Sequence, residues 1–269
     1  MPRIKNEDMY QRASMETIMG EAKRICDSER QASRLFDRAL EQDIPRFDRQ
    51  ELVLGRVLGR GGFCEAREIT SIKLVKGRKS ETAKPRKLAR GDSASSLPLP
   101  NESTREFLAR RVWSKSSKYV IKQLNVALVK QDRVEFLRGL VDISLETSFL
   151  ASLQHNNIIG VVGVSSTCPF QDPNYFIMLE KLKDTLSSRI NQWMQIKRTA
   201  RGITGLVTGG KRKAKSLLVD RLLVAHDIAE GMSYLHSRRI AFRDLVRVQN
   251  VKGEVPCLTM FLETRQCGL

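Results

Sequence analysis

Two opposite charges lie on predicted apolar faces, a lysine on a strand and a glutamate on a helix. Residues 118–124 alternate as a half-buried strand does, so Lys122 shares a face with Val120 and Leu124. Farther along, Glu146 interrupts an apolar stripe at helical spacing. The other members of that stripe are Ile143, Leu150 and Leu153. Because a buried charge is costly unless an opposite charge meets it, the two residues are predicted to form an ion pair. The alternative is that Lys122 extends to the edge of its sheet.

A glycine-rich segment, residues 58–66 (LGRGGFCEA), precedes the lysine. The glycines Gly59, Gly61 and Gly62, followed by Phe63, would let a hairpin bring backbone N–H groups close to phosphate oxygens with no Cβ in the way. Taken alone, the same glycines favour a plain turn.

An arginine and an aspartate, Arg243 and Asp244, stand just beyond a helix predicted over residues 217–236. The apolar stripe of that helix consists of Leu218, Leu222, Ala225, Ala229 and Met232.

In this order the glycine segment, Lys122, Glu146 and residues 234–245 (YLHSRRIAFRDL) resemble the first two-thirds of a eukaryotic-type protein kinase catalytic domain. The serine/threonine kinases are the more numerous class of that family. The resemblance implies an α+β fold, with a small antiparallel-sheet lobe carrying one helix, followed by an incomplete helical lobe. It also implies ATP as cofactor, with the ion pair on the α- and β-phosphates and Asp244 as catalytic base beside Arg243.

By the same resemblance, a nucleotide-binding surface is expected along the strands and the connection to the second lobe. Leu179 would close the back of the adenine pocket, and backbone groups of Glu180 and Leu182 would bond the adenine edge, although residues 176–182 (FIMLEKL) also fit an ordinary buried strand. The residues expected to contact the nucleotide are Leu58, Gly59, Gly61, Gly62, Phe63, Ala66, Val120, Lys122, Leu179, Glu180 and Leu182.

The sequence departs from the family pattern at several positions. Cys64 stands at the third glycine and Ala66 at the usual valine. Beyond Asp244, Val246 replaces the expected lysine and Gln249 the metal-binding asparagine, and no Asp-Phe-Gly follows. Mg²⁺ is expected for the family, yet its ligands are absent, so the polypeptide is predicted to have no measurable phosphotransferase activity. The tail would then be a splice or reading-frame product, or the chain a genuine truncated, kinase-like binder.

The remaining elements fit this organisation. The expected strands are 52–58, 63–74, 118–124, 158–164 and 175–180, and the expected helices 9–42, 133–154 and 217–236. The expected domains are a helical extension over 1–50, a kinase-like domain over 51–245 and a non-homologous tail over 246–269. Within the kinase-like domain, a small lobe over 51–180 carries a basic insertion at about 76–117, and the start of the helical lobe over 181–245 carries a basic loop over 195–215.

The net charge of +17 is concentrated in two stretches. Residues 67–118 hold 14 lysines and arginines against 5 acids, and residues 195–215 hold 7 with no acid. Both are rich in small polar residues, so they are interpreted as solvated, mobile insertions. Contact with acidic partners or RNA, or a localisation signal over 211–215, is the alternative, but no aromatic residues are interleaved for base stacking.

The composition indicates in which compartment the protein is expected to occur. No apolar run reaches the roughly 20 residues a membrane span needs, and the five cysteines lack metal-ligand spacing. A cytoplasmic or nuclear protein with reduced thiols, and no membrane, is the expectation. We rank three functions: a protein kinase acting on an unknown protein substrate, a non-catalytic kinase-like module binding nucleotide or a partner, and a basic nucleic-acid-binding protein.

Overall fold

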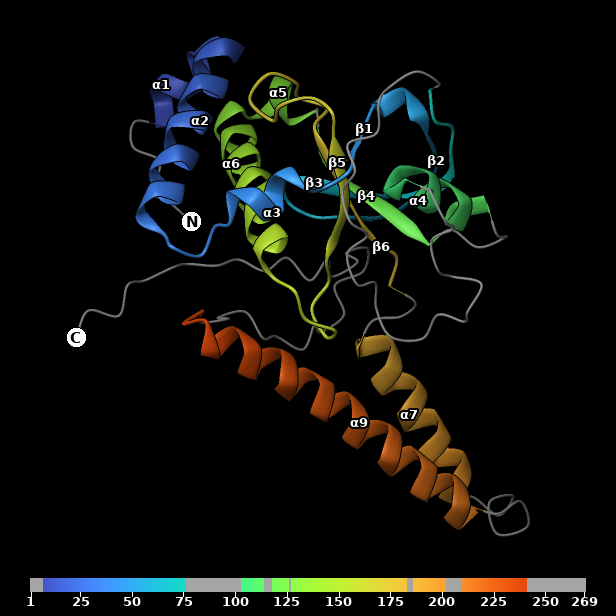
Figure 1. Ribbon diagram of the computed structural model, residues 1–269. Helices are drawn as coiled ribbons and strands as arrows, with labels where there is room; N and C mark the ends of the chain where they lie inside the picture. The colour runs from blue at the N-terminus through green and yellow to red at the C-terminus, as the bar shows by residue number, and fades with distance from the viewer. Residues whose placement is uncertain are drawn as a thin grey trace, which may run out of the picture. The chain divides into compact units, whose positions relative to one another are not determined.

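The computed structural model describes residues 7–75, 103–113, 118–125, 127–182, 186–201 and 210–240 (Figure 1). These residues fall into two compact units that meet in the chain after Lys181. We refer to the first, up to Lys181, as the sheet unit, and to the second, from Leu182, as the helix pair.

The sheet unit is built on six strands in the order β1-β5-β6-β4-β3-β2. The strands are β1 Arg46–Phe47, β2 Leu52–Arg60, β3 Cys64–Ile72, β4 Tyr119–Leu124, β5 Val161–Ser165 and β6 Phe176–Glu180. Every pair of neighbours is antiparallel except β1 and β5. The α+β fold and the predicted strands are thereby confirmed, and β1 adds a short parallel edge that the sequence pattern did not indicate.

One face of the sheet is covered by helix α4, Thr104–Trp113. Its side chains Phe107, Leu108 and Val112 are buried against a core that includes Tyr119 and Ile121 of β4. The prediction of a wholly solvated insertion over 76–117 is therefore wrong for this helix, because three apolar side chains at helical spacing give it a face to bury.

A capping box starts α4 and an ion pair anchors it. The Ser103 backbone N–H donates to Glu106 Oε2 at 2.8 Å, and the Glu106 backbone N–H donates to Ser103 Oγ at 3.3 Å. Arg105 then places Nη2 2.6 Å from each carboxylate oxygen of the fully buried Glu51. The same carboxylate accepts from the backbone N–H groups of Asp48 and Val75, so it is fully compensated.

The opposite face of the sheet carries helix α6, Arg133–Ser152, which follows the short helix α5, Leu128–Gln131. The helix begins at the N-cap Asp132, whose carboxylate accepts from the N–H groups of Val134 and Glu135. Since β4 alternates, Tyr119 and Ile121 face α4 while Lys122 and Leu124 face α6. The predicted helix over 133–154 is confirmed, ending two residues earlier.

Three helices precede the sheet and pack against α6 (Figure 1). They are α1 Glu7–Arg12, α2 Met15–Ala32 and α3 Arg38–Gln42. The predicted helical segment over 9–42 is confirmed in kind but is divided, because Ser14 and Asp37 cap new helices by accepting bonds from backbone N–H groups two or three residues on. The buried face of α2 consists of Ile18, Met19, Ala22 and Cys26.

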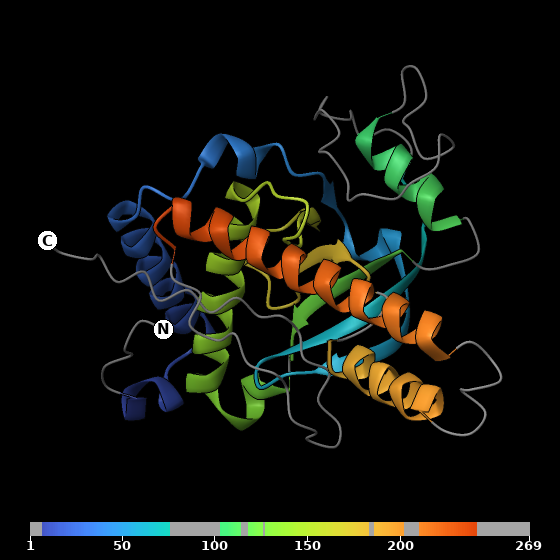
Figure 2. The ribbon, with the colours of Figure 1, turned by 90° about the horizontal axis from the view of Figure 1, so that it is seen from below.

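The helix pair contains α7, Leu186–Arg201, and α9, Gly210–Ser237, which lie side by side (Figures 1 and 2). Residues 195–201 and 210–215 are helical, so the prediction of a basic loop over 195–215 is wrong for them. Lysine and arginine are good helix formers, and this propensity outweighs the missing apolar period. No described helix combines the length and apolar character needed to cross a membrane.

Candidate functional site

The candidate site is centred on the predicted ion pair, which the structure contains. Lys122 Nζ of β4 lies 2.5 Å from Glu146 Oε2 of α6, and the two side chains are only 5% and 8% exposed. The pair sits between the middle of the sheet and its covering helix, where neither charge is solvated by bulk water. Extension of Lys122 to the sheet edge is therefore excluded, and each charge offsets the desolvation cost of the other.

A third charged group, Asp142, lies one helical turn before Glu146 on α6. Its Oδ2 atom is buried with no hydrogen-bond partner among the described residues. Burial raises the pKa of this carboxyl from 3.8 to about 7; Lys122 opposes that shift and the nearby Glu146 adds to it. Sequence reasoning missed Asp142, although its spacing of four residues from Glu146 was a readable signal of a shared helix face.

The glycine segment forms the hairpin between β2 and β3. The Gly61 N–H donates to the Cys64 carbonyl at 2.7 Å, closing the turn. A Cβ at Gly62 would meet no atom within 4 Å, and one at Gly61 only the Cys64 carbonyl at 3.7 Å, so the hairpin tip is open on that side. Beside it, the Asn125 N–H donates to the Phe63 carbonyl at 2.8 Å, tying the tip to the end of β4.

Helix α6 approaches this hairpin closely at Gly139. A Cβ there would lie 2.8 Å from Phe63 Cβ and 2.8 Å from Leu124 Cδ2, distances that folded proteins do not tolerate. A glycine is therefore needed where the helix, the hairpin tip and β4 converge. The helix that carries Glu146 is in this way packed directly on the glycine segment.

The strand register brings several of the predicted nucleotide contacts onto one face. Gly59 pairs with Ala66, Ala66 with Lys122, and Val120 with Leu179. Residues directly opposite in antiparallel strands share a face, so these five positions line the side of the sheet that carries the ion pair.

The other predicted contacts stand apart from that row. Leu58 lies on β2 where the register with β3 is irregular, and Glu180 ends β6. Leu182 belongs to the helix pair and is 61% exposed. The roles of all these residues as nucleotide contacts stay predictions.

The predicted catalytic residues Arg243 and Asp244 lie outside the described residues, as do Val246 and Gln249. What the structure gives is the helix end that leads to them. The Ile240 N–H donates to the Leu235 carbonyl and the Arg239 N–H to the His236 carbonyl, with Arg239 at φ 61°. This is a Schellman motif, in which Leu235 and Ile240 are both buried.

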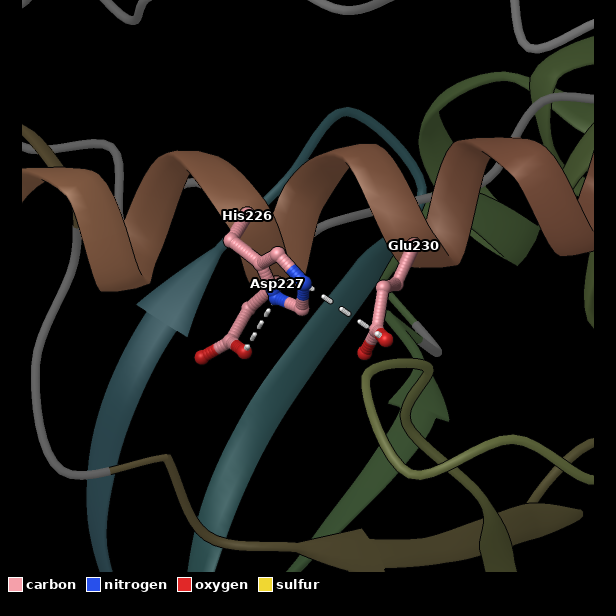
Figure 3. A group of neighbouring side chains, drawn as sticks. All are labelled: His226, Asp227 and Glu230. Carbon is pink, nitrogen blue, oxygen red and sulfur yellow. Dashed lines mark ion pairs between the residues drawn. The ribbon is translucent and has the colours of Figure 1, made fainter.

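One other cluster of potential ligands is found in the described part of the chain, on the surface of α9 (Figure 3). His226 Nδ1 lies 3.8 Å from Asp227 Oδ1, and His226 Nε2 lies 3.7 Å from Glu230 Oε1. All three side chains are exposed, and such spacing on a helix surface is ordinary for solvated ion pairs. We assign no metal to this cluster.

A cavity of about 580 Å³ lies elsewhere in the sheet unit. Its walls come from α2, α3, α6 and the segment between β5 and β6, and include Arg30, Glu41, Ser144 and Tyr175. Neither Lys122 nor any predicted nucleotide contact lines it, so it is distinct from the candidate site.

The fold and the site define a class: an antiparallel-sheet lobe in which a central strand and its covering helix share a buried lysine–glutamate pair. The profile of one family, protein tyrosine and serine/threonine kinase, matches residues 109–251, just over half of the chain. The chain belongs to this protein kinase family. The matched residues include Lys122, Glu146 and Asp244 and leave out the glycine segment, whose assignment rests on its own residues. No curated protein matches the chain at a significant level.

Proposed function

We propose that this kinase domain binds ATP on the face of the sheet that carries Lys122 and Glu146, and that its family reaction is transfer of the γ-phosphate to serine or threonine hydroxyls of a protein. The observation that carries the proposal is the 2.5 Å contact between Lys122 Nζ and Glu146 Oε2, at side chains less than a tenth exposed. A buried lysine–glutamate pair between an inner strand and its covering helix is the arrangement by which the family holds the α- and β-phosphates of ATP.

In this proposal each residue has one task. Lys122 donates to the α- and β-phosphates, and Glu146 fixes the direction of its ammonium group. The hairpin tip at Gly61 and Gly62, where the space is open, covers the phosphates with backbone N–H groups. Adenine would pack between the apolar side chains that share the Lys122 face, with Leu179 behind it and hydrogen bonds to the backbone at Glu180 and Leu182.

The reacting hydroxyl would be oriented by Asp244, beside Arg243, as general base. Mg²⁺ serves the family by neutralising charge on the transferring phosphoryl group. The residues of this chain do not fit that ion, because Gln249 stands at the metal-binding asparagine and no Asp-Phe-Gly occurs among the 269 residues. We therefore derive no step through a metal and expect these 269 residues to transfer no phosphate.

Calorimetric titration with ATP tests the binding step. The chain should bind ATP, and Lys122→Met should weaken binding about tenfold or more, since a charge-assisted contact to phosphate is lost. Lys73→Met is the matched control, because Lys73 is an exposed lysine directly after the neighbouring strand β3. Absence of ATP binding, or equal affinity in Lys122→Met, would refute the proposed site.

The transfer step is tested separately, by incubating the purified chain with labelled ATP and a generic protein substrate. No label should be transferred. Transfer that Asp244→Asn abolishes would show that these residues suffice for catalysis and would overturn the inactivity we expect.

A non-catalytic kinase-like module is the second candidate, favoured by Gln249 at the position of the metal-binding asparagine. Nucleotide-induced thermal stabilisation without turnover would support it over a kinase. Nucleic-acid binding through the basic residues of 67–118 and 195–215 ranks third, and would be revealed by affinity that falls steeply as salt rises. The protein substrate is not identified, and a cytoplasmic or nuclear location stays an expectation from the scattered cysteines.

A further inference from the structure

The helices that precede the sheet contact α6 from its first residue to its last. At the start, Gln11 Nε2 donates to Asp132 Oδ1 at 2.7 Å, and Arg133 donates from its backbone N–H to Gln11 Oε1 and from its guanidinium to the Ala13 carbonyl. At the end, the Asp37 N–H donates to Ser152 Oγ at 2.8 Å. Helix α6 is therefore held between this layer and the sheet.

The contacts of Arg30, on α2, fall in the half of α6 that carries Glu146. Arg30 Nη2 lies 2.5 Å from Ser148 Oγ and 3.5 Å from the Ser144 carbonyl, and 3.3 Å from Glu41 Oε1 of α3. Ser144 and Ser148 stand two residues before and two residues after Glu146. Two residues correspond to about 200° of helix rotation, so Ser144 and Ser148 lie on nearly the opposite side of α6 from Glu146. Arg30 therefore contacts the side of α6 that faces away from Lys122.

Small polar side chains on α6 accept these contacts. Ser144, Ser148 and Ser152 recur every fourth residue, are at most 4% exposed, and receive the contacts of Arg30 and Asp37. The buried face of α2 beside them consists of Ile18, Met19, Ala22 and Cys26. Apolar packing is non-directional, whereas a guanidinium bonded to two points on the helix favours one rotation and one height of that helix.

We propose that α2 is a positioning element for the candidate site, and that Arg30 is its positioning residue: by fixing α6 from behind, it sets the distance between Glu146 and Lys122. Loss of the Arg30 contacts lets α6 rotate or shift, and the ion pair opens while the sheet remains folded. The consequence for ATP rests on the proposed function, but the effect on the ion pair does not.

The test measures the acylation of Lys122 by an amine-reactive reagent in the full chain without nucleotide, by mass spectrometry, relative to the exposed Lys73. A paired and buried ammonium group reacts slowly. Arg30→Ala should raise the ratio of Lys122 to Lys73 modification about tenfold, because hydrogen bonds of a charged group hold the closed position. Global unfolding would also expose Lys122 and raise the same ratio, so circular dichroism and urea denaturation must first show that the variant is as fully folded as wild type under the labelling conditions.

Arg24→Ala is the matched control on the same helix. Arg24 makes an ion pair within α2, with Glu21 at 2.5 Å, and its side chain is 71% exposed. This variant should leave the ratio at the wild-type value. An unchanged ratio in Arg30→Ala, or an equal rise in Arg24→Ala, overturns the proposal.

Two further variants decide the matter if Arg30→Ala does not fold. Ser148→Ala removes one contact and leaves Arg30 in place, so a rise of about threefold is expected. Arg30→Lys keeps a charge but lacks the planar fork that reaches two acceptors, and should fall between wild type and Ser148→Ala. If both variants keep the wild-type ratio, the proposal is wrong.

The proposed function and the proposed role of Arg30 can be refuted independently of each other. If the wild-type chain does not bind ATP, the proposed function is refuted while the protection of Lys122 is unaffected. If both hold, Arg30→Ala weakens ATP binding and Arg24→Ala does not, which joins the preceding helices to the nucleotide site.

Discussion

Helices α6 and α9 have similar apolar stripes and opposite surroundings. In α6, fourteen of 20 residues are buried, including the serines that meet α2 and α3. In α9, the stripe residues Leu218 and Leu222 are 56% and 60% exposed, and the neighbouring Leu223 is 57% exposed. A stripe at helical spacing thus predicts the helix in both cases, whereas burial depends on the elements that the rest of the unit supplies.

The difference also separates two kinds of charge. On α6, burial makes Glu146 and Asp142 depend on their neighbours, and the pKa of Asp142 rises to about 7. On α9, His226, Asp227 and Glu230 lie close together in solvent, where pairing contributes little. Charged residues that depend on their neighbours are therefore expected on the covered helix α6 rather than on α9.

The prediction with the largest expected effect compares one leucine-to-alanine substitution on each of the two helices. Leu140→Ala removes a fully buried side chain of α6 and should lower the free energy of unfolding by about 3–5 kcal/mol. Leu222→Ala makes the same change at a 60% exposed position of α9 and should cost less than about 0.5 kcal/mol. Urea denaturation measures both, and equal costs would mean that α9 is covered as fully as α6.

The second test uses the pH dependence of Asp142. Its pKa is raised in the folded state, so the unfolded chain loses this proton from about pH 4 while the folded chain keeps it until about pH 7. The group therefore destabilises the fold increasingly across that window. Asp142→Asn should raise the free energy of unfolding by about 2–4 kcal/mol at pH 8 and change it little at pH 4.

The difference between variant and wild type is the quantity to follow, since other carboxylates titrate over the same range in both proteins. A gain that stays constant from pH 4 to pH 8 would contradict the burial of this carboxyl. Asp227→Asn, on the exposed cluster of α9, serves as the control for an amide placed in solvent and should change the free energy of unfolding by less than about 0.5 kcal/mol at pH 8.

The smallest test concerns the end of α9. Arg239 adopts a left-handed conformation that favours glycine, at the position of the Schellman motif where glycine is usual. Arg239→Gly should therefore stabilise the helix end by about 0.5–1 kcal/mol, measured by thermal unfolding. A loss of stability would show that the Arg239 side chain contributes more than its backbone strain costs.

Much of the sheet unit could be predicted from the sequence, because its strands alternate and its charges stand out on apolar faces. The Lys122–Glu146 pair is the best example, since each residue is costly without the other. Helix α4 was missed although Ser103 and Glu106 form a capping box, because the surrounding basic and polar residues dominated the interpretation. The contacts of Arg30 with α6 join residues more than 110 positions apart, and no local pattern encodes them.

The part that stays predicted is the chemistry beyond α9. Asp244 and Arg243 lie outside the described residues, so their roles rest on the family to which the chain belongs. The candidate site in the sheet unit can be tested without them.

The most direct test is a double-mutant cycle on ATP affinity, with Lys122→Met, Glu146→Ala and the combined variant titrated by calorimetry. If the two residues act as one unit, each single change weakens ATP binding about tenfold or more, and the combined variant binds no more weakly than Lys122→Met alone. Wild-type affinity in Glu146→Ala, or losses that multiply in the combined variant, would contradict a nucleotide site built on this pair.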